Sequence, residues 1–434
     1  MSARRSSPPR RVFIGLVEIA GYYGGLARGL RAKGVEVTFA DLSEHRYAYG
    51  GDDQTTLIRL ARRTARWGAA GASPLRRMGA KFLHRFALVL LMAWAIPRHD
   101  AFVFGFRTSF LRMRELPLLR LLGKRIVLVF NGSDARPPYI DGTDMDPAHG
   151  RTIADCIGIA RRKTSEIRRA ERWADLVVSH ALYLHLFERP AAGFQVLGLP
   201  GPLRSEFPPV PPEPPASPVR VLHAPSNPTV KGTALVRAAV ERLRAEGLPI
   251  ELVELHGVPN SVVHDEMARC HFVVDQAYSD GPMLGFAAEA AVYGRPAVVG
   301  SYGWDEIRRL MPAASIAPVQ GCHPDDLESA IRRLATDADH RRRLGAAARA
   351  FVEEWAAADA VADRYLRLLA GERPPEWMCD PGAVRYVHGV GLSEARAREI
   401  VAAVLALGGV AALRIDDKPE LQRAFARFAA EPAV

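Results

Sequence analysis

Cysteine is scarce in this sequence, and its placement excludes two kinds of site. Only four cysteines occur among the 434 residues, at Cys156, Cys270, Cys322 and Cys379. They lie far apart and form no CxxC pair, so neither a disulfide framework nor a cysteine-based metal box is indicated. A reduced, cytoplasmic setting is therefore expected.

Long apolar runs are also missing. The longest one, Phe86–Pro97, holds about twelve residues, whereas a membrane-spanning helix needs roughly 20. The basic N-terminus leads into a short apolar strand and not into the apolar region of a signal peptide. We therefore expect no transmembrane segment. With 48% apolar and 24% charged residues, the composition is that of a globular protein.

Acidic residues are absent between Gln54 and His99. Nine basic residues lie there: Arg59, Arg62, Arg63, Arg66, Arg76, Arg77, Lys81, Arg85 and Arg98. Apolar residues such as Trp67 and Phe82 alternate with them at helical spacing, which suits an anionic membrane surface. A diphospholipid acceptor fits the same stretch, and a solvated basic face above core residues is the simpler alternative. No nucleic-acid-binding module is recognisable, so no nucleic acid is expected as a partner.

The chain divides at a proline-rich stretch. Residues 199–218 hold nine prolines, which neither continue a helix nor donate to a sheet, so an extended linker is predicted. The first 200 residues carry 32 Lys and Arg against 17 Asp and Glu, and the remainder carries 26 against 31. This asymmetry indicates an anionic partner for the first half. We expect domains at 1–198 and 219–372 and a helical extension at 373–434.

Both halves alternate strands with helices. Short apolar runs such as Arg11–Glu18, Arg125–Phe130 and Phe272–Gln276 predict buried strands, and amphipathic stretches such as Ile153–Trp173 predict helices between them. This alternation predicts two doubly wound α/β domains of the Rossmann-like type that face a cleft. Ligands of such sheets bind beyond the carboxyl ends of the strands.

The first strand of the second half leads into a candidate phosphate site. The strand Val219–His223 is followed by a small polar loop that contains Ser226 and Asn227, and Lys231 and Gly232 open the next helix. A helix N-terminus offers unpaired amides and a positive dipole end, which a lysine strengthens for a diphosphate. A surface lysine in an ordinary strand–helix turn is the alternative. Contact of His223 with the nucleotide is expected from its position.

A second candidate piece follows the strand Phe272–Gln276. A glycine loop that includes Met283, Leu284 and Gly285 enters a helix carrying Glu289. A carboxylate in the first turns of a helix can accept two hydrogen bonds from a ribose diol. An acidic residue that merely stabilises the helix dipole is the alternative.

These two pieces, in this order, resemble the donor-binding half of retaining GT-B glycosyltransferases of the family 4 type. The resemblance covers roughly residues 219–300. It implies that Lys231 is the phosphate lysine and Glu289 the ribose-binding glutamate, followed by the motif tail Ala290, Gly294, Pro296 and Val298. The loop amides near Met283–Gly285 would reach the sugar or its phosphate. Gly281 stands where the family's first glutamate falls.

The first half supplies candidates for the other side of the cleft. The glycine-rich turn that contains Gly24 and Gly25 resembles the loop that faces the donor in this family, and glycine allows close approach of backbone amides. Asn131, Asp134 and Arg136 follow the strand Arg125–Phe130 and are the acceptor-side candidates, with Asp134 orienting an acceptor hydroxyl. An Asx-type turn that stabilises the loop is the alternative.

The combined expectation is a retaining sugar transferase, with Lys231, Glu289 and Asp134 at its catalytic centre. The donor is a nucleoside diphosphate sugar that carries most simply a hexose, and the acceptor is unknown, with lipid-linked, cell-envelope and natural-product hydroxyls as options. No cofactor and no metal are expected, and Asp144-Met145-Asp146 is interpreted as a chance match to a metal signature. The rivals are an epimerase of the same fold and a non-catalytic sugar-nucleotide-binding scaffold, which the missing glutamate at 281 favours.

Overall fold

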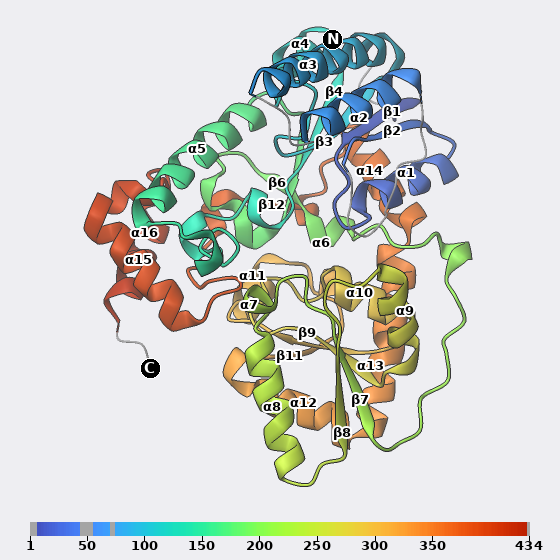
Figure 1. Ribbon diagram of the computed structural model, residues 1–434, viewed down its shortest axis with the longest axis vertical. Helices are drawn as coiled ribbons and strands as arrows, with labels where there is room; N and C mark the ends of the chain where they lie inside the picture. Colours follow the sequence, from blue (N-terminus) through green and yellow to red (C-terminus); the bar gives the residue numbers. More distant parts are fainter. Residues whose placement is uncertain (1–6, 44–54, 70–73, 432–434) are drawn as a thin grey trace.

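Two parallel sheets form the frame of the molecule (Figure 1). The computed structural model describes residues 7–43, 55–69 and 74–431. The first sheet has the spatial order β12-β6-β5-β4-β3-β1-β2 and is parallel except for β12. Its strands are β1 (Arg11–Leu16), β2 (Glu36–Asp41), β3 (Ala101–Gly105), β4 (Arg125–Val129), β5 (Leu176–Ser179), β6 (Ala191–Gly193) and β12 (Met378–Cys379).

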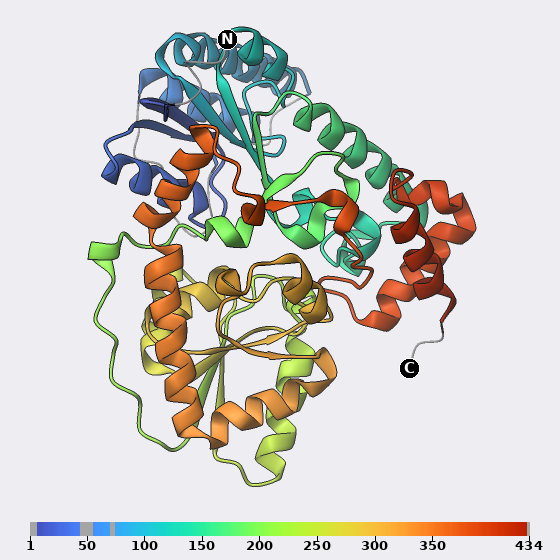
Figure 2. The same ribbon diagram turned by 180° about the vertical axis from the view of Figure 1, so that it is seen from behind.

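The second sheet is wholly parallel and has the order β11-β10-β9-β7-β8. Its strands are β7 (Val219–His223), β8 (Ile250–Glu254), β9 (Phe272–Gln276), β10 (Ala297–Gly300) and β11 (Gln320–Cys322). Both sheets turn their strand carboxyl ends toward the space between the domains (Figures 1 and 2). The expected pair of doubly wound domains facing each other, the GT-B arrangement, is confirmed.

The central strands are buried on both faces, which explains their almost uninterrupted apolar sequences. In the first domain the covering helices are α1 (Tyr22–Ala32), α2 (Thr56–Ala69), α3 (Pro74–Arg98), α4 (Leu116–Leu121), α5 (Ile153–Glu171) and α6 (Phe194–Leu197). In the second they are α7 (Pro228–Lys231), α8 (Thr233–Ala245), α9 (Asn260–Arg269), α10 (Gly285–Val292), α11 (Trp304–Leu310), α12 (Leu327–Thr336) and α13 (Ala338–Phe351).

The helix α14 (Ala358–Leu369) returns to the first domain, although the sequence places it in the second. Its apolar side packs into the same cluster as α1, and Tyr365 shares a hydrogen bond of 2.5 Å with Tyr22. The two helices approach closely because Gly29 has no side chain: a Cβ there would lie 1.9 Å from the carbonyl oxygen of Ala358. The second domain therefore ends before α14, at about residue 357, and not at residue 372 as the predicted bounds 219–372 have it.

The last part of the chain completes the first domain. Two helices, α15 (Glu394–Gly408) and α16 (Pro419–Ala430), join the core cluster that also holds residues of α5. Strand β12 pairs with β6 at the edge of the first sheet. The described part of the segment that was predicted as a separate helical extension, residues 373–431, thus packs on the first domain.

The helix α3 is longer than the apolar run suggested. Among the described residues, Arg77–Arg98 is long and apolar enough, by length and composition only, to cross a membrane, and 28% of its most apolar stretch is buried. The helix is longer than the run Phe86–Pro97 because apolar residues continue between the basic residues before Phe86. The same helix packs into the first domain through Ala87, Leu91 and Ala95.

Candidate functional site

Lys231 lies at the carboxyl edge of the second sheet. After β7 the chain makes the single turn of α7, and its N-cap Asn227 accepts hydrogen bonds from the amides of Thr229 and Val230. Gly232 then adopts a left-handed conformation (φ 71°), and α8 starts at Thr233. The lysine thus precedes the N-terminus of α8 as predicted, although α7 intervenes between the strand and that helix.

A chain of hydrogen bonds connects Lys231 to the predicted glycine loop. Its Nζ donates to Oε1 of Gln276 at 2.6 Å, and Gln276 Nε2 donates to Oγ of Ser279 at 2.7 Å. The Ser279 hydroxyl in turn donates to the carbonyl of Gly281 at 2.9 Å. The two motif pieces, which are separated in the sequence, therefore belong to one continuous polar edge.

The helix α10 presents an open N-terminus at the same edge. Its N-cap, Leu284, has no capping side chain, and its first residue, Gly285, is exposed. The first amides of this helix are therefore available to an anion. Ser226, in the loop after β7, is exposed as well.

Glu289 extends from α10 and contacts a residue of α9. Its Oε2 lies 3.1 Å from Nε2 of His264, whose Nδ1 lies 3.1 Å from the hydroxyl of Tyr293. The contact fixes the carboxylate through one oxygen. The other oxygen is left to accept hydrogen bonds from a diol.

The acceptor-side candidates lie at the carboxyl end of β4. Asn131 caps a single turn, Gly132–Asp134, and its amide donates to Oδ2 of Asp134 at 3.2 Å. Burial raises the pKa of Asp134 to about 6, although the Asn131 amide and the positive charges of Lys163, Arg107 and Arg136 oppose the shift. Asp134 also lines a cavity of about 650 Å³ between this loop and the first half of α5.

Arg136 is placed differently from the prediction, because it is buried between the domains. Its Nε lies 3.0 Å from Oδ2 of Asp280, Nη1 donates to Asp141 at 3.1 Å, and Nη2 donates to the hydroxyl of Tyr183 at 2.9 Å. A guanidinium that is 7% exposed and engaged in this way does not reach an acceptor. It joins the acceptor-side loop to the donor loop as a buried ion pair.

Comparisons with known proteins report on the fold. No protein-family model matches the chain, and no curated protein matches it either. Among solved structures, an alpha-glucosyltransferase in complex with UDP and a mismatched 13-mer DNA is 12% identical (83% of this chain, 99% of that one, TM-score 0.49). HepE of Anabaena in complex with UDP-glucose is 11% identical (84% and 100%, 0.48). A putative UDP-N-acetylglucosamine 2-epimerase from Listeria monocytogenes is 12% identical (85% and 98%, 0.40).

These similarities concern the fold and assign no activity to the chain. Within the described residues, no group of three or more His, Cys, Asp or Glu side chains is arranged to hold a metal ion. The two acidic residues of Asp144-Met145-Asp146 have other contacts: Asp144 pairs with Arg151 and Lys163, and Asp146 accepts a hydrogen bond from Asn227 across the domain boundary at 2.9 Å.

His223 is a structural residue and does not face the cleft. It is fully buried, its Nδ1 contacts the carbonyl of Val274 at 2.8 Å, and its Nε2 contacts Oγ1 of Thr233 at 2.9 Å. Burial lowers its pKa, so the ring is neutral at physiological pH. The predicted contact with the nucleotide is therefore wrong, because both ring nitrogens already have partners inside the domain.

The backbone amides of the glycine-rich turn in the first domain already have hydrogen-bond partners inside that domain. The carboxylate of Glu18 accepts hydrogen bonds from the amides of Ile19 (2.7 Å), Tyr23 (3.1 Å) and Gly24 (2.7 Å). The amide of Gly25 donates to Gly21 within α1, and a Cβ at Gly25 would lie 2.3 Å from the carbonyl oxygen of Pro200. These glycines serve helix capping and linker packing, which contradicts the predicted approach of their amides to a diphosphate.

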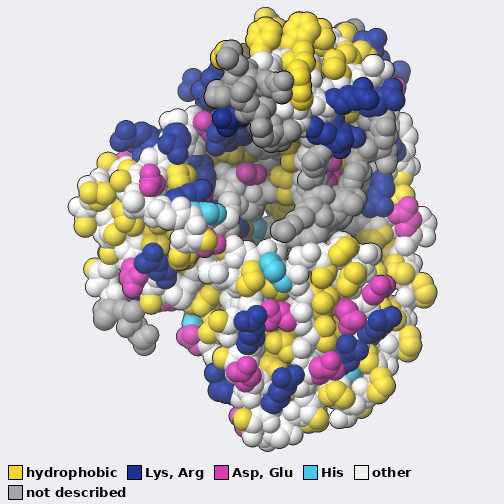
Figure 3. Space-filling model, viewed as in Figure 1, with side chains coloured by type: hydrophobic (Ala, Val, Ile, Leu, Met, Phe, Trp, Pro, Cys, Tyr) yellow, Lys and Arg dark blue, Asp and Glu magenta, His cyan; other side chains and the backbone are white. Residues whose placement is uncertain are grey.

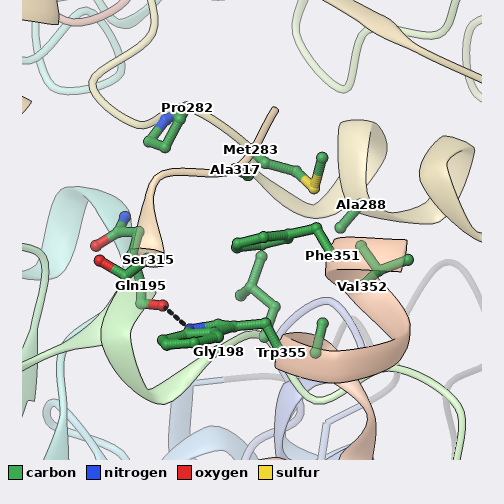
Figure 4. Close-up of a pocket in the computed structure, with 12 residues that line it drawn as sticks. Gln195, Gly198, Pro282, Met283, Ala288, Ser315, Ala317, Phe351, Val352 and Trp355 are labelled. Carbon is green, nitrogen blue, oxygen red and sulfur yellow. Dashed lines mark hydrogen bonds between the residues drawn. The ribbon is translucent and has the colours of Figure 1, made fainter. Parts of the chain in front are cut away.

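The Met283 side chain lines an apolar pocket of about 30 Å³ at the hinge, which is the stretch 352–357 where the chain crosses from the second domain to the first (Figure 4). Phe351 and Trp355 line it from the crossover to α14, and Trp355 donates to the carbonyl of Gln195 at 2.9 Å. The pocket has room for roughly one water molecule. The Met283 side chain therefore packs against the hinge, and only the backbone of Met283 can take part in the donor loop together with Leu284 and Gly285.

Sequence reasoning missed a buried polar cluster that closes around Gly281. A Cβ at this position would lie 3.0 Å from Nε2 of His180 and 3.3 Å from Nε2 of Gln195, both from the first domain. Burial, with Arg136 nearby, lowers the pKa of His180 to about 3. A side chain at position 281 would crowd His180 and Gln195 of the first domain, which no local signal reveals. His264 and Gln276 were also missed, because their contacts with Glu289 and Lys231 join residues that are distant in the sequence.

Proposed function

We propose that this protein transfers a sugar from a nucleoside diphosphate sugar to an acceptor hydroxyl. One observation carries the proposal: Lys231 follows β7, and α10, with its uncapped N-terminus and Glu289, follows the neighbouring strand β9, so these groups come after the carboxyl ends of two adjacent strands of the second sheet. A cation and helix amides suit a diphosphate, and a carboxylate suits a ribose diol.

In the proposed reaction the acceptor oxygen bonds to the anomeric carbon as the bond from that carbon to the β-phosphate oxygen breaks. The acceptor proton leaves with the nucleoside diphosphate. Lys231 and the α10 amides stabilise the charge that develops on the leaving group, so no metal ion or other cofactor is needed. We propose retention of anomeric configuration and a hexosyl group, as the family resemblance implies. Asp134 orients the attacking hydroxyl.

Two alternative functions remain open because position 281 holds a glycine and not a carboxylate. A scaffold would bind nucleotide without releasing sugar, and an epimerase would convert the donor without an acceptor. Mass spectrometry of products from a panel of donors, with and without acceptors, separates these functions. The proposal expects a glycosylated acceptor, and an epimerised donor or an unchanged donor that nonetheless binds would contradict it.

The pH dependence of transfer tests the role of Asp134. Because burial raises its pKa to about 6, the carboxylate is mostly protonated at pH 5 and mostly ionised at pH 7. The ionised form is the stronger hydrogen-bond acceptor for a hydroxyl. We expect kcat at saturating donor to rise about tenfold over this interval. Asp134→Asn should lower kcat roughly a hundredfold, remove the rise and leave nucleoside diphosphate affinity unchanged. A variant that keeps the same pH profile would exclude this role.

We also propose that the enzyme is cytoplasmic and binds peripherally to an anionic membrane. The helices α3 and α4 pack into the same core cluster, so they cover the same face of the first sheet. The outer side of α3 exposes large apolar side chains at three- and four-residue spacing: Met78 (65% exposed), Phe82 (74%), Phe86 (52%) and Val89 (40%). Trp67 of α2 (62%) and Leu121 of α4 (83%) are also exposed.

Basic side chains accompany this apolar face. Arg63, Arg77, Lys81 and Arg85 are exposed on α2 and α3, and no acidic residue occurs on either helix. Figure 3 shows apolar and basic side chains together at the top of the molecule. Apolar residues next to unopposed cations suit the interface of an anionic bilayer. The face that anchors α3 in the first domain lies opposite, so we propose that the helix lies on the membrane and does not span it.

Liposome flotation tests the membrane proposal. The double variant Met78→Glu, Phe82→Glu changes two exposed side chains and should leave folding intact. It loses about 3 kcal/mol or more of apolar burial in the bilayer, so binding to phosphatidylglycerol vesicles should fall roughly a hundredfold. Leu407→Glu, an equally exposed change on α15 (61%), is the control and should bind as the wild type does. Failure of the wild type to float with these vesicles at low salt would refute the proposal.

A further inference from the structure

The first domain contains a cavity large enough for an acceptor, and the sequence did not predict it. Its volume of about 650 Å³ lies in the usual range for small-molecule sites. The walls come from the residues after β3 and β4, from the loop at 144–151 and from the first half of α5. Figure 3 shows the molecule hollowed between the two domains. Because Asp134 lines the cavity, a ligand inside it lies beside the group that the proposed function assigns to the acceptor.

The charges of the lining are unevenly satisfied. Asp144 is neutralised by Arg151 at 2.7 Å and by Lys163 at 2.9 Å. Asp155 accepts hydrogen bonds from the amide and hydroxyl of Thr152 at the start of α5, at 2.9 and 2.7 Å. The third acidic side chain in the lining, Asp134, accepts the hydrogen bond from the Asn131 backbone amide at 3.2 Å, so all three are engaged by other groups.

The basic side chains are only partly engaged. Arg107 pairs with Glu166 at 3.3 Å through Nε, which leaves the two terminal nitrogens of its guanidinium without a described ion pair. Arg162 lines the cavity, is exposed, and makes no hydrogen bond or ion pair of its own within the described residues. His149 also lines the wall. The cavity thus offers guanidinium donors that the protein itself does not use.

We propose that this cavity binds an anionic group of the acceptor, a phosphate or a carboxylate, and that Arg162 is its main contact. The inference rests on the proposed function and names the chemical class of its acceptor. A planar guanidinium binds such oxyanions through two parallel hydrogen bonds, which fixes orientation as well as position. An anion held by Arg162 places a neighbouring hydroxyl toward Asp134. The positive balance of the first half of the chain draws the same class of ligand to this domain.

Two adjacent arginines of α5 provide a matched test. Arg162→Glu reverses the charge in the cavity, and Arg161→Glu makes the same change on an exposed residue outside its lining. Glycerol 3-phosphate is the probe and glycerol its neutral match, with binding followed by titration calorimetry in the presence of nucleoside diphosphate. The wild type and Arg161→Glu should bind glycerol 3-phosphate and not glycerol, and Arg162→Glu should bind it at least about tenfold more weakly.

The source of the anion is resolved by a second arm. Phosphatidylglycerol vesicles replace glycerol 3-phosphate, and consumption of the donor sugar is measured. Consumption with vesicles alone identifies a lipid headgroup, consumption with the soluble probe identifies a free phosphate, and either result supports the proposal if Arg162→Glu abolishes it. Equal binding by wild type and Arg162→Glu would overturn it. Nucleoside diphosphate affinity should be the same in all three proteins. If the wild type does not bind nucleoside diphosphate at all, the result counts against the proposed donor site and not against the cavity.

Discussion

Lys231→Ala is expected to weaken binding of nucleoside diphosphates by roughly 10- to 150-fold, which corresponds to about 1.5–3 kcal/mol for a hydrogen bond to a charged group. Lys231 begins the hydrogen-bonded edge that continues through Gln276 and Ser279 to the Gly281 loop, so its loss removes a positive charge beside the proposed diphosphate position. Titration calorimetry with UDP, GDP, ADP and TDP, whichever binds the wild type, measures the effect.

Two variants frame that result. Lys231→Arg keeps the charge and should retain part of the affinity. Lys33→Ala removes the C-cap lysine of α1, which pairs with Asp363 at 2.6 Å far from the second sheet, and should leave the affinity unchanged. An unaltered dissociation constant in Lys231→Ala would remove the phosphate role of this residue, whatever the other variants show.

Glu289→Ala is expected to abolish discrimination between ribose and deoxyribose. A carboxylate fixed by His264 through one oxygen can accept hydrogen bonds from both ribose hydroxyls through the other. The wild type should therefore bind a nucleoside diphosphate about tenfold or more tightly than its 2′-deoxy and 3′-deoxy analogues. The variant should bind all three alike, at the weaker level.

The readout separates recognition from a general loss of structure, because only the difference between analogues is interpreted. Glu241→Ala, an exposed change on α8, serves as the control and should keep the wild-type preference. If Glu289→Ala still prefers the ribonucleotide, the sugar edge of the nucleotide is recognised elsewhere.

The sheets could be predicted because parallel strands that are covered on both faces read as short apolar runs between polar loops. Helix α14 shows where this reasoning stops. The pattern from Ala338 to Leu369 reads as continuous helix, and the turn at Ala357 (φ −57°, ψ 131°) occurs within an alanine run that carries no glycine or proline signal. The chain changes domains there because α14 packs on α1, which is a long-range cause.

For the candidate site, the positions of the residues in the fold could be predicted, but the directions of their side chains could not. Lys231, Asn227 and Glu289 lie at the carboxyl edge because strand ends in a parallel sheet share one side. The direction of each side chain was not predictable, since it depends on partners distant in the sequence. His223 turns inward to Thr233, and Arg136 turns to Asp280 of the other domain. The Glu18 carboxylate accepts hydrogen bonds from the amides of the glycine-rich turn, and the spacing of the glycines does not reveal this contact.

The most direct test of the account is a crystal structure of the protein with the nucleoside diphosphate sugar that binds it. We expect the diphosphate between Nζ of Lys231 and the amide of Gly285, with the ribose hydroxyls on Glu289 and the sugar directed toward Asp134. A nucleotide bound elsewhere, for example inside the cavity beside Arg162, with Lys231 still held by Gln276 and Glu289 still free of ligand, would contradict it.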